Sequence, residues 1–447
     1  MSLTKDRVRY VIYALFLAEL LFFTRQSSYF GPYASPVILY GTAVALSMCV
    51  LYYARGRQWH LAPTAAVALP ARQWWHTTWA RGLALATVVA AGGLNNTNLV
   101  KHEVRGFRPI LEFADIIPAL QAYARRWLVG AEIYTPLTWE LGYFELPTYL
   151  PAMWFPFVIA ERLGFDYRYM AWGIFLLGVA FYELLVWRLQ KNAWQTALLA
   201  LVPFLSFYAF ISHVWAYVGI TVEYMLLGYY ALLVAGILLR WWPLQAVGLL
   251  LCLLSRYSLV FWAPLYLGLM FFYGSRRHAL LIAGTVAVGI VALYIVPYLS
   301  HNWGLFMEVQ RSYTDAAAYE WKHLNSEGMP IHLYNGLGFA SFFYKYGHGS
   351  LYDRIGLLKT VHVGLLVSIV ATAAVVYYRQ HVPRTDYRVF VVVVLKVYLA
   401  TFYAFLQVPY AYLVTLGVFM SVFLVLITAG LKIPMAEPEP TVVEGLN

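Results

Sequence analysis

The sequence predicts an all-α, polytopic membrane protein of about 12 transmembrane helices, with amphipathic juxtamembrane helices in its first large external loop. Of its 447 residues, 62% are hydrophobic and only 12% are charged. The mean hydropathy is +0.64, which is far too apolar for a soluble chain of this size. Apolar runs of about 17 to 22 residues recur, and such runs cross the hydrocarbon core as helices. The 37 Tyr and 16 Trp suit the two membrane interfaces.

Twelve apolar runs define the expected spans. They cover residues 8–24, 36–54, 80–98, 169–187, 195–212, 221–239, 243–256, 258–273, 279–297, 358–378, 389–406 and 410–431. No small-residue cleavage site follows the first run, so we expect a retained helix. The shorter run 148–163 is expected to be re-entrant or to lie on the membrane surface, because a span there would place Arg188 and Lys191 outside.

The basic residues predict the orientation of the chain. They are scattered at the ends of apolar runs and form no patch, so the net charge of +10 does not indicate nucleic-acid binding. The positive-inside rule then places both termini in the cytoplasm. The residues concerned are Lys5, Arg7, Arg55, Arg57, Arg72, Arg81, Arg188, Lys191, Arg240, Arg276, Arg277, Arg379, Arg384, Arg388 and Lys432.

The spans divide the chain into five regions. Residues 1–79 form two N-terminal spans and a cytoplasmic connector, 80–300 a core with the external segment 99–168, 301–357 a second external segment, 358–432 the C-terminal spans, and 433–447 a Pro- and Glu-rich tail. We expect this tail to be disordered and cytoplasmic.

The first external segment carries the most specific pattern. An acidic stretch leads to Asp115, which precedes apolar residues at helical spacing over 116–128 with Arg125 and Arg126 on another face. This pattern indicates an amphipathic helix on the membrane, ended by Gly130. The simplest interpretation of Asp115 is an N-cap, whose side chain accepts from the free amides of the first turn.

The whole order of features resembles the GT-C class of integral-membrane glycosyltransferases, particularly the family 87 polyprenyl-phosphate-mannose-dependent mannosyltransferases. These features are a span, a short acidic loop, Asp115, an amphipathic helix closed by Gly130 and Tyr134, and then residues 146–151 (LPTYLP) opening a short apolar helix. The resemblance is best over 80–190 and looser up to about 300. It implies that Asp115 is the catalytic base, that Gly130 and Tyr134 are framework positions, and that the protein lies in a bacterial inner (plasma) membrane.

Two features depart from that family pattern. Many enzymes of the class carry paired acids where this chain has Ala114-Asp115, and two additional spans precede the core. The partner of Asp115 could be Glu103 or Glu112.

The implied activity is transfer of a sugar, mannose or a related one, from a polyprenyl-phosphate donor to a glycolipid or cell-envelope glycan on the extracytoplasmic face. Such a transfer needs one general base for the acceptor hydroxyl and positive charge or donors for the leaving phosphate. Arg256 lies at an outer helix turn and is the leading candidate for the phosphate. The alternative is an Arg that extends to the lipid headgroups.

Other polar residues gather at the outer ends of the spans. His213 and Glu223 adjoin apolar residues, where an ionisable group is costly and tends to be functional. The second external segment mixes cations with aromatic residues, which suits phosphate and sugar binding but also an aromatic loop lying on lipid. The expected donor-phosphate and substrate-binding residues are Arg256, His213, Glu223, Glu103, His102, Tyr134, Lys322, His323 and His332.

No cofactor is expected beyond the lipid-linked donor. The histidines show no zinc-ligand spacing, Cys49 and Cys252 lie inside apolar runs, and no glycine-rich phosphate loop occurs. Two other functions stay open: a transporter or flippase for lipid-linked glycans, and a polysaccharide polymerase or ligase of the same membrane. Asp115 discriminates among them, because only the glycosyltransferase requires its carboxylate.

Overall fold

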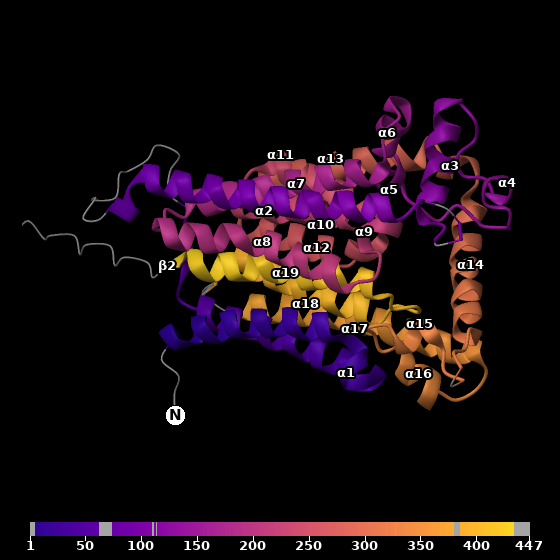
Figure 1. Cartoon of the computed structure of the whole chain (residues 1–447). Coiled ribbons are helices and arrows are strands. Elements are labelled where there is room, and N and C mark those ends of the chain that lie inside the picture. Colours follow the sequence, from indigo (N-terminus) through magenta and orange to yellow (C-terminus); the bar gives the residue numbers. More distant parts are fainter. Residues whose placement is uncertain are drawn as a thin grey trace, which may run out of the picture.

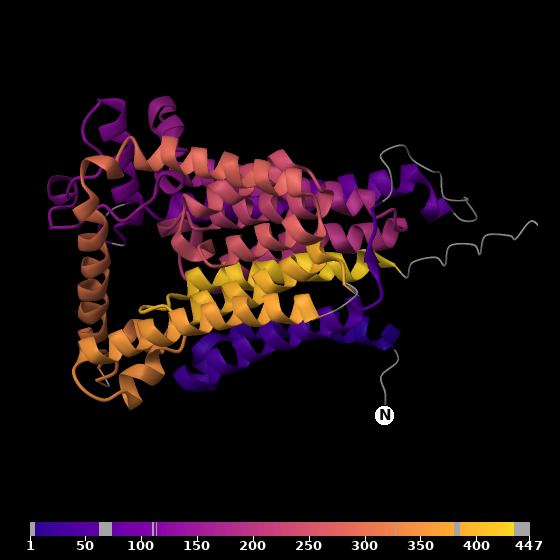
Figure 2. The ribbon, with the colours of Figure 1, turned by 180° about the vertical axis from the view of Figure 1, so that it is seen from behind.

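The computed structural model describes residues 5–61, 74–109, 111–112, 114–326, 328–379 and 385–432. Apart from two strands of two residues each, all regular elements in these ranges are helical. Figure 1 shows a bundle of long helices with similar directions, and short helices gathered at one end. Helix α14 (Trp303–Lys322) lies across that end, and the reverse view shows it joining α13 to the region before α17 (Figure 2).

Eight helical segments of the described chain are long and apolar enough to cross a membrane, which makes this a multi-pass membrane protein. They are Phe30–Ala54 within α1 (Lys5–Ala54), α2 (Thr78–Gly106), α7 (Tyr167–Arg188), α8 (Ala193–His213), Arg276–Ile295 (α13, Arg276–Ile290, with η3, Val291–Ile295), α17 (Leu351–Arg379), α18 (Tyr387–Ala404) and α19 (Ala411–Gly430). Helices α10 (Tyr224–Leu239), α11 (Trp242–Leu253) and α12 (Trp262–Tyr273) are apolar but shorter. With 12 residues each, α11 and α12 rise by only about 18 Å. The predicted count of 12 spans is therefore confirmed only in part.

The first helix folds back on itself. Tyr53 lies within electrostatic range of Arg9 and Tyr13, whereas a straight helix would separate Tyr13 from Tyr53 by about 60 Å. Gly31 has a φ of 72°, a conformation that favours glycine, and Pro32 follows it. The two indigo halves of α1 accordingly lie side by side in both views (Figures 1 and 2). Each half coincides with one expected N-terminal span.

Helix α10 is the buried centre of the bundle, with nearly all of its side chains enclosed. It crosses α7 at Gly178 and Gly228. A Cβ on Gly178 would lie 2.7 Å from the Cα of Gly228, and a Cβ on Gly228 would collide with the carbonyl of Ile174. Small residues of this kind allow two membrane helices to approach closely. This crossing fixes the start of α10, which carries Glu223.

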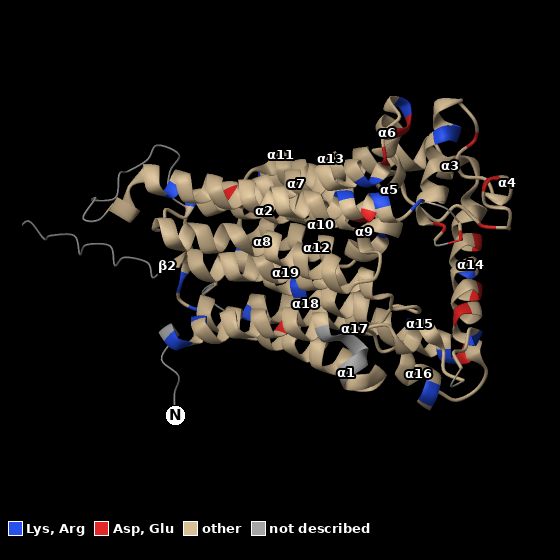
Figure 3. Cartoon of the chain, in the orientation of Figure 1, with Lys and Arg blue, Asp and Glu red and all other residues tan. Residues whose placement is uncertain are grey.

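The end of the bundle opposite α14 is closed by a small sheet. Strand β1 (Gln58–Trp59) pairs antiparallel with β2 (Leu431–Lys432), and Arg388 donates to the Trp59 carbonyl. Lys191 lies within electrostatic range of Arg9 and Lys432. The start of α1 and the end of β2 thus lie at the end of the bundle opposite α14. Several of the basic residues that were expected on the cytoplasmic side, such as Lys191 and Lys432, lie at this end as well. The acidic residues gather instead around α3–α6 and α14 (Figure 3).

Both expected external segments lie at the α14 end. Their elements are α3 (Ile116–Leu128), α4 (Thr138–Leu141), α5 (Pro151–Trp154), α6 (Phe157–Leu163), η4 (Leu299–His301), α14, α15 (Ile331–Tyr334) and α16 (Ala340–Tyr346). The short α9 (Tyr217–Ile220) and η2 (Tyr257–Leu259) lie between bundle helices. Segment 148–163 contains only α5 and α6, so the expectation that it is not a span is confirmed. The tail 433–447 and most of the connector, except η1 (Trp74–His76), lie outside the described residues.

Candidate functional site

Asp115 stands at the start of α3, an amphipathic helix that buries Ile117 and Leu120 and ends before Gly130, whose φ is 69°. The expected helix and its glycine end are confirmed. Trp127, expected on the apolar face, is exposed. Asp115 occupies the N-cap position, but its side chain accepts from no helix amide. Its exposed carboxylate instead accepts from the Tyr143 hydroxyl, Oδ2 to Oη 2.8 Å. The capping interpretation of the side chain is therefore wrong.

Arg126 of α3 holds the segment that leads to Tyr143, namely the loop before α4 and Glu140 of α4 itself. Both carboxylate oxygens of Glu140 accept from this guanidinium, at 2.6 and 2.8 Å. The carbonyls of Thr135 and Pro136 accept from it at 2.8 and 2.9 Å. A bidentate, planar donor of this kind fixes orientation as well as distance. The interaction orders the loop between α3 and α4 and so positions the tyrosine that contacts Asp115.

Glu145 is the second acid of this region. Burial, and after it the charge of Asp115, raises the pKa of Glu145 to about 7. The acids that the sequence offered as partners were Glu103 and Glu112. Glu103 lies on α2, where its electrostatic neighbours are His102 and Arg168, and Glu112 is exposed in the turn before Asp115. The acidic neighbour of Asp115 therefore comes from a loop the pattern did not single out.

Glu223 and Arg256, both expected from the sequence, form an ion pair at the α14 end of the bundle, which is called the outer end below. Glu223 precedes α10 and its side chain is 5% exposed, while the Arg256 side chain, before η2, is 25% exposed. The Nε of Arg256 is buried and has no hydrogen-bond partner among the described residues. The guanidinium thus lies inside the protein beside an acid, which does not fit an Arg that extends to the lipid headgroups. The Nε is enclosed, so the accessible 25% of the side chain is the part that a ligand could contact.

Tyrosines connect the ion pair with Asp115. Tyr149 lies within electrostatic range of both Asp115 and Glu223, and burial, followed by these charges, raises its pKa well above the ordinary value. Tyr412, at the start of α19, lies in range of Asp115, Glu223 and Arg256. These contacts define one polar cluster at the outer end. Its members are Asp115, Tyr143, Glu145, Tyr149, Glu223, Arg256, Tyr313, Tyr403, Tyr410 and Tyr412.

Two members of the polar cluster, Tyr313 and Arg256, keep accessible surface although protein surrounds them. Tyr313, on α14, lies within electrostatic range of Arg256 and Glu223 and is enclosed by protein, and this burial raises its pKa. Tyr313 nevertheless keeps 43% of its surface accessible, and Arg256 is likewise enclosed but accessible. Tyr313 and Arg256, together with the exposed Asp115, are therefore members of the polar cluster that a ligand could contact.

Tyr134 lies next to the polar cluster, where it holds the backbone of Tyr149. Its hydroxyl donates to the Tyr149 carbonyl at 2.8 Å and accepts from Trp154 Nε1 at 3.2 Å. Its ring centroid lies 4.9 Å from that of Tyr298, and both residues line a separate cavity of about 20 Å³. Tyr134 thus positions Tyr149, as a framework residue would.

The remaining expected residues lie at the margin of the polar cluster or away from it. His102 lines an open depression at the outer end of α2, with Lys101 and Arg105. His213, at the end of α8, approaches the carbonyl of Ala209 with its Nδ1 at 3.0 Å. Lys322 is exposed at the end of α14.

His323 and His332 meet close to Glu320 of α14. The His332 ring packs against Tyr410, with centroids 5.1 Å apart. Tyr410 lies within electrostatic range of both Glu320 and Asp115. His332 therefore adjoins the polar cluster through this tyrosine.

Sequence reasoning missed six members of the polar cluster. These are Tyr143, Glu145, Tyr149, Tyr403, Tyr410 and Tyr412. The pattern Pro409-Tyr410-Ala411-Tyr412, with two tyrosines where an apolar span begins, is the signal that could have found two of them. The C-terminal spans therefore contribute to a site whose expected residues all lay between His102 and His332.

Comparison with known proteins gives no assignment: no family model, no curated protein and no solved structure matches this chain. Fold and geometry alone establish a helical, multi-span membrane protein with a polar, tyrosine-rich cluster at one end.

Proposed function

We propose that this protein is a glycosyltransferase that moves a sugar, mannose or a related one, from a polyprenyl-phosphate donor to a glycolipid or cell-envelope glycan. One observation carries the proposal. The exposed carboxylate of Asp115 and the guanidinium of Arg256, whose Nε has no hydrogen-bond partner among the described residues, lie within range of the same tyrosine, Tyr412. A base and a phosphate-binding cation beside the same tyrosine are what an inverting transfer needs.

In the proposed step, Asp115 takes the proton of the acceptor hydroxyl while the oxygen attacks the anomeric carbon. The bond from that carbon to the donor phosphate breaks, and its electron pair leaves with the lipid phosphate. Arg256 stabilises the departing charge from the accessible part of its side chain while Glu223 holds its Nη2. Tyr143 holds the Asp115 carboxylate in place by its hydrogen bond. Tyrosine rings of the polar cluster supply faces for sugar stacking.

The membrane arrangement follows from the two ends of the bundle. Arg9, Lys191 and Lys432 gather at the end closed by the small sheet, and cationic loops favour the cytoplasm. We therefore assign both termini to the cytoplasm and the polar cluster to the extracytoplasmic face of an inner (plasma) membrane. In this arrangement α10, α11, α12 and the first half of α1 complete a bundle of 12 helices, and the bilayer supplies the lipid donor.

Glu145 offers a second base for the same step. A carboxyl with a pKa of about 7 is well matched to proton transfer near neutral pH. Asp115 is preferred because its carboxylate is exposed and already oriented by Tyr143. Variants at the two positions separate these assignments.

The test is transfer of labelled sugar from a panel of polyprenyl-phosphate donors to a membrane lipid extract. Asp115→Asn should lower the transfer rate at least about 100-fold, the range for loss of a general base. Asp315→Asn is the matched control, because this exposed acid at the same end also accepts from a tyrosine, Tyr352, at 3.1 Å. It should transfer at the wild-type rate.

Three other outcomes would change the assignment. Full activity in Asp115→Asn, with loss in Glu145→Gln, would move the base role to Glu145. Full activity in both variants would remove these acids from the mechanism. No transfer by the wild-type protein from any donor would contradict the proposed function and favour the transporter or the polymerase and ligase class.

A further inference from the structure

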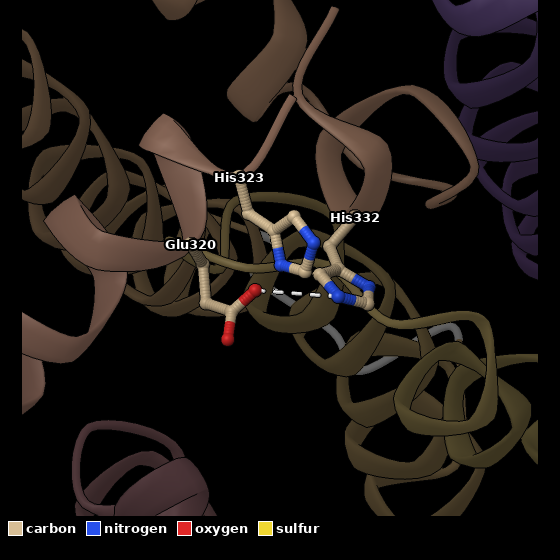
Figure 4. A group of neighbouring side chains, drawn as sticks. All are labelled: Glu320, His323 and His332. Atoms are coloured by element: carbon tan, nitrogen blue, oxygen red, sulfur yellow. Dashed lines mark ion pairs between the residues drawn. The ribbon is translucent and has the colours of Figure 1, made fainter. Parts of the chain in front are cut away.

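Three metal-ligating side chains converge at the outer end, beyond the polar cluster. Glu320 belongs to the last turns of α14, His323 follows that helix, and His332 lies in α15. One ligand atom from each lies within 4.8 Å of the other two. Figure 4 shows the carboxylate and the two imidazoles directed toward one another, with the ion pair between Glu320 and His332 marked.

A tight hairpin creates this convergence. Leu324 and Pro330 form an antiparallel bridge, and the Ile331 amide donates to the His323 carbonyl at 3.0 Å. Gly328 has a φ of 73°, the left-handed conformation that such a return of the chain requires. The hairpin sets His323 beside His332, although they are farther apart in the sequence than the paired histidines of a His-x3–5-His motif. This explains why the sequence predicted no metal.

The contacts within the triad leave ligand capacity unused. The Oε2 of Glu320 is buried and makes no hydrogen bond to a described residue. The Nε2 of His332 approaches it at 3.3 Å as an ion pair. The two imidazole rings lie 5.9 Å apart at 81°, so they are not stacked. The ion pair accounts for this buried oxygen only when His332 is protonated, whereas a cation bound by all three groups satisfies it with neutral imidazoles.

We propose that Glu320, His323 and His332 bind one divalent ion of the Zn²⁺ class, with a fourth coordination position open. Two imidazoles and one carboxylate are a donor set of zinc sites that keep such a position. Ligand atoms in a tetrahedral zinc site lie about 3.4 Å apart, so small side-chain rotations close the triad around an ion. Tyr410 packs on His332 and lies within range of Asp115. The ion would therefore lie at the margin of the polar cluster.

The experiment measures metal binding and needs no sugar donor, so it is independent of the proposed function. The full-length protein is purified in detergent without a histidine tag, treated with a chelator and titrated with Zn²⁺ alone. Bound zinc per chain is measured by elemental analysis after gel filtration, and affinity by competition with a chromogenic chelator. We expect one Zn²⁺ per chain and a rise in thermal stability on binding.

His323→Ala is the principal variant, because this side chain is exposed and its removal should not disturb folding. It should weaken Zn²⁺ binding at least about 100-fold, since even outer-shell changes cost 10- to 100-fold. Glu320→Gln should weaken binding as well. His301→Ala, an exposed histidine in η4, is the control and should bind like the wild type. The proposal is overturned if the wild type binds no Zn²⁺ at micromolar concentration, or if His323→Ala binds with unchanged affinity.

Discussion

The ion pair between Glu19 and Lys396 gives a prediction about stability that does not depend on any assigned activity. Glu19 lies in the first half of α1 and Lys396 in α18, and their side chains are 1% and 0% exposed. Ser421 of α19 donates to the second oxygen of Glu19 at 2.5 Å. The Lys396 ammonium also donates to the Gly417 carbonyl at 2.7 Å. Three helices therefore meet at one buried polar contact.

Removing either partner leaves a charged group in the core. Lys396→Met deprives Glu19 of its countercharge and leaves one hydroxyl as its donor. Breaking a buried pair in this way costs about 3 to 5 kcal/mol, and Glu19→Leu should cost a similar amount. If the two effects were independent, the double variant would lose about 6 to 10 kcal/mol. Because the double variant removes both charges together, we expect it to lose less than about 2 kcal/mol.

The free energy of unfolding is measured in mixed micelles by titration with a denaturing detergent, for the wild type, both single variants and the double variant. Ser421→Ala is the control, because it keeps the ion pair and should cost about 1.5 to 3 kcal/mol, the range for one hydrogen bond to a charged group. A double variant that loses the sum of the two single effects would show that the charges do not stabilise each other. The reasoning from the buried contact would then be wrong.

Two further predictions concern Glu145 and the α7–α10 crossing. The folded chain retains the Glu145 proton up to about pH 7, whereas the unfolded chain releases it near pH 4.5. The stability that the protonated Glu145 contributes to the folded chain is therefore complete below pH 4.5 and is lost as the pH rises through 7. Thermal unfolding is measured from pH 4.5 to 8 for the wild type and Glu145→Gln. Over this range the free energy of unfolding should fall by about 1 to 2 kcal/mol more in the wild type, after allowance for solvent screening. Parallel pH profiles of the two proteins would contradict the raised pKa. Gly228→Ala should lower the free energy of unfolding by about 1 to 3 kcal/mol, because the new methyl group meets the Ile174 carbonyl. Gly284→Ala, where a Cβ meets open space, is its control, and equal stability of these two variants would show that the helices separate freely.

Local patterns predicted the fold class and the position of Asp115 well, because hydropathy, charge and glycine act over a few neighbouring residues. The amphipathic helix 116–128 and the non-spanning segment 148–163 follow from such patterns. The number of spans did not follow, because residues 243–256 and 258–273 form helices of only 12 residues each.

Contacts between distant segments were beyond this reasoning. Glu223 and Arg256 were each chosen for their surroundings, but their pairing depends on how α10 and α11 pack. Glu145 and Tyr412 join Asp115 only through loop paths and helix packing. The meeting of His323 with His332 depends on a hairpin whose turn is set by backbone conformation.

The position of α14 across the bundle divides the polar cluster between two kinds of support. Glu223 and Arg256 are attached to the tightly packed α10 and α11, where the glycine crossing leaves little room for adjustment. Tyr313 belongs to α14, which follows the single-turn η4 and is followed by the hairpin that carries His323 and His332. A displacement of α14 would therefore move Tyr313 relative to the ion pair without altering the pair itself. The accessible tyrosine surface and the charged pair rest on different parts of the chain, so that each can vary without the other.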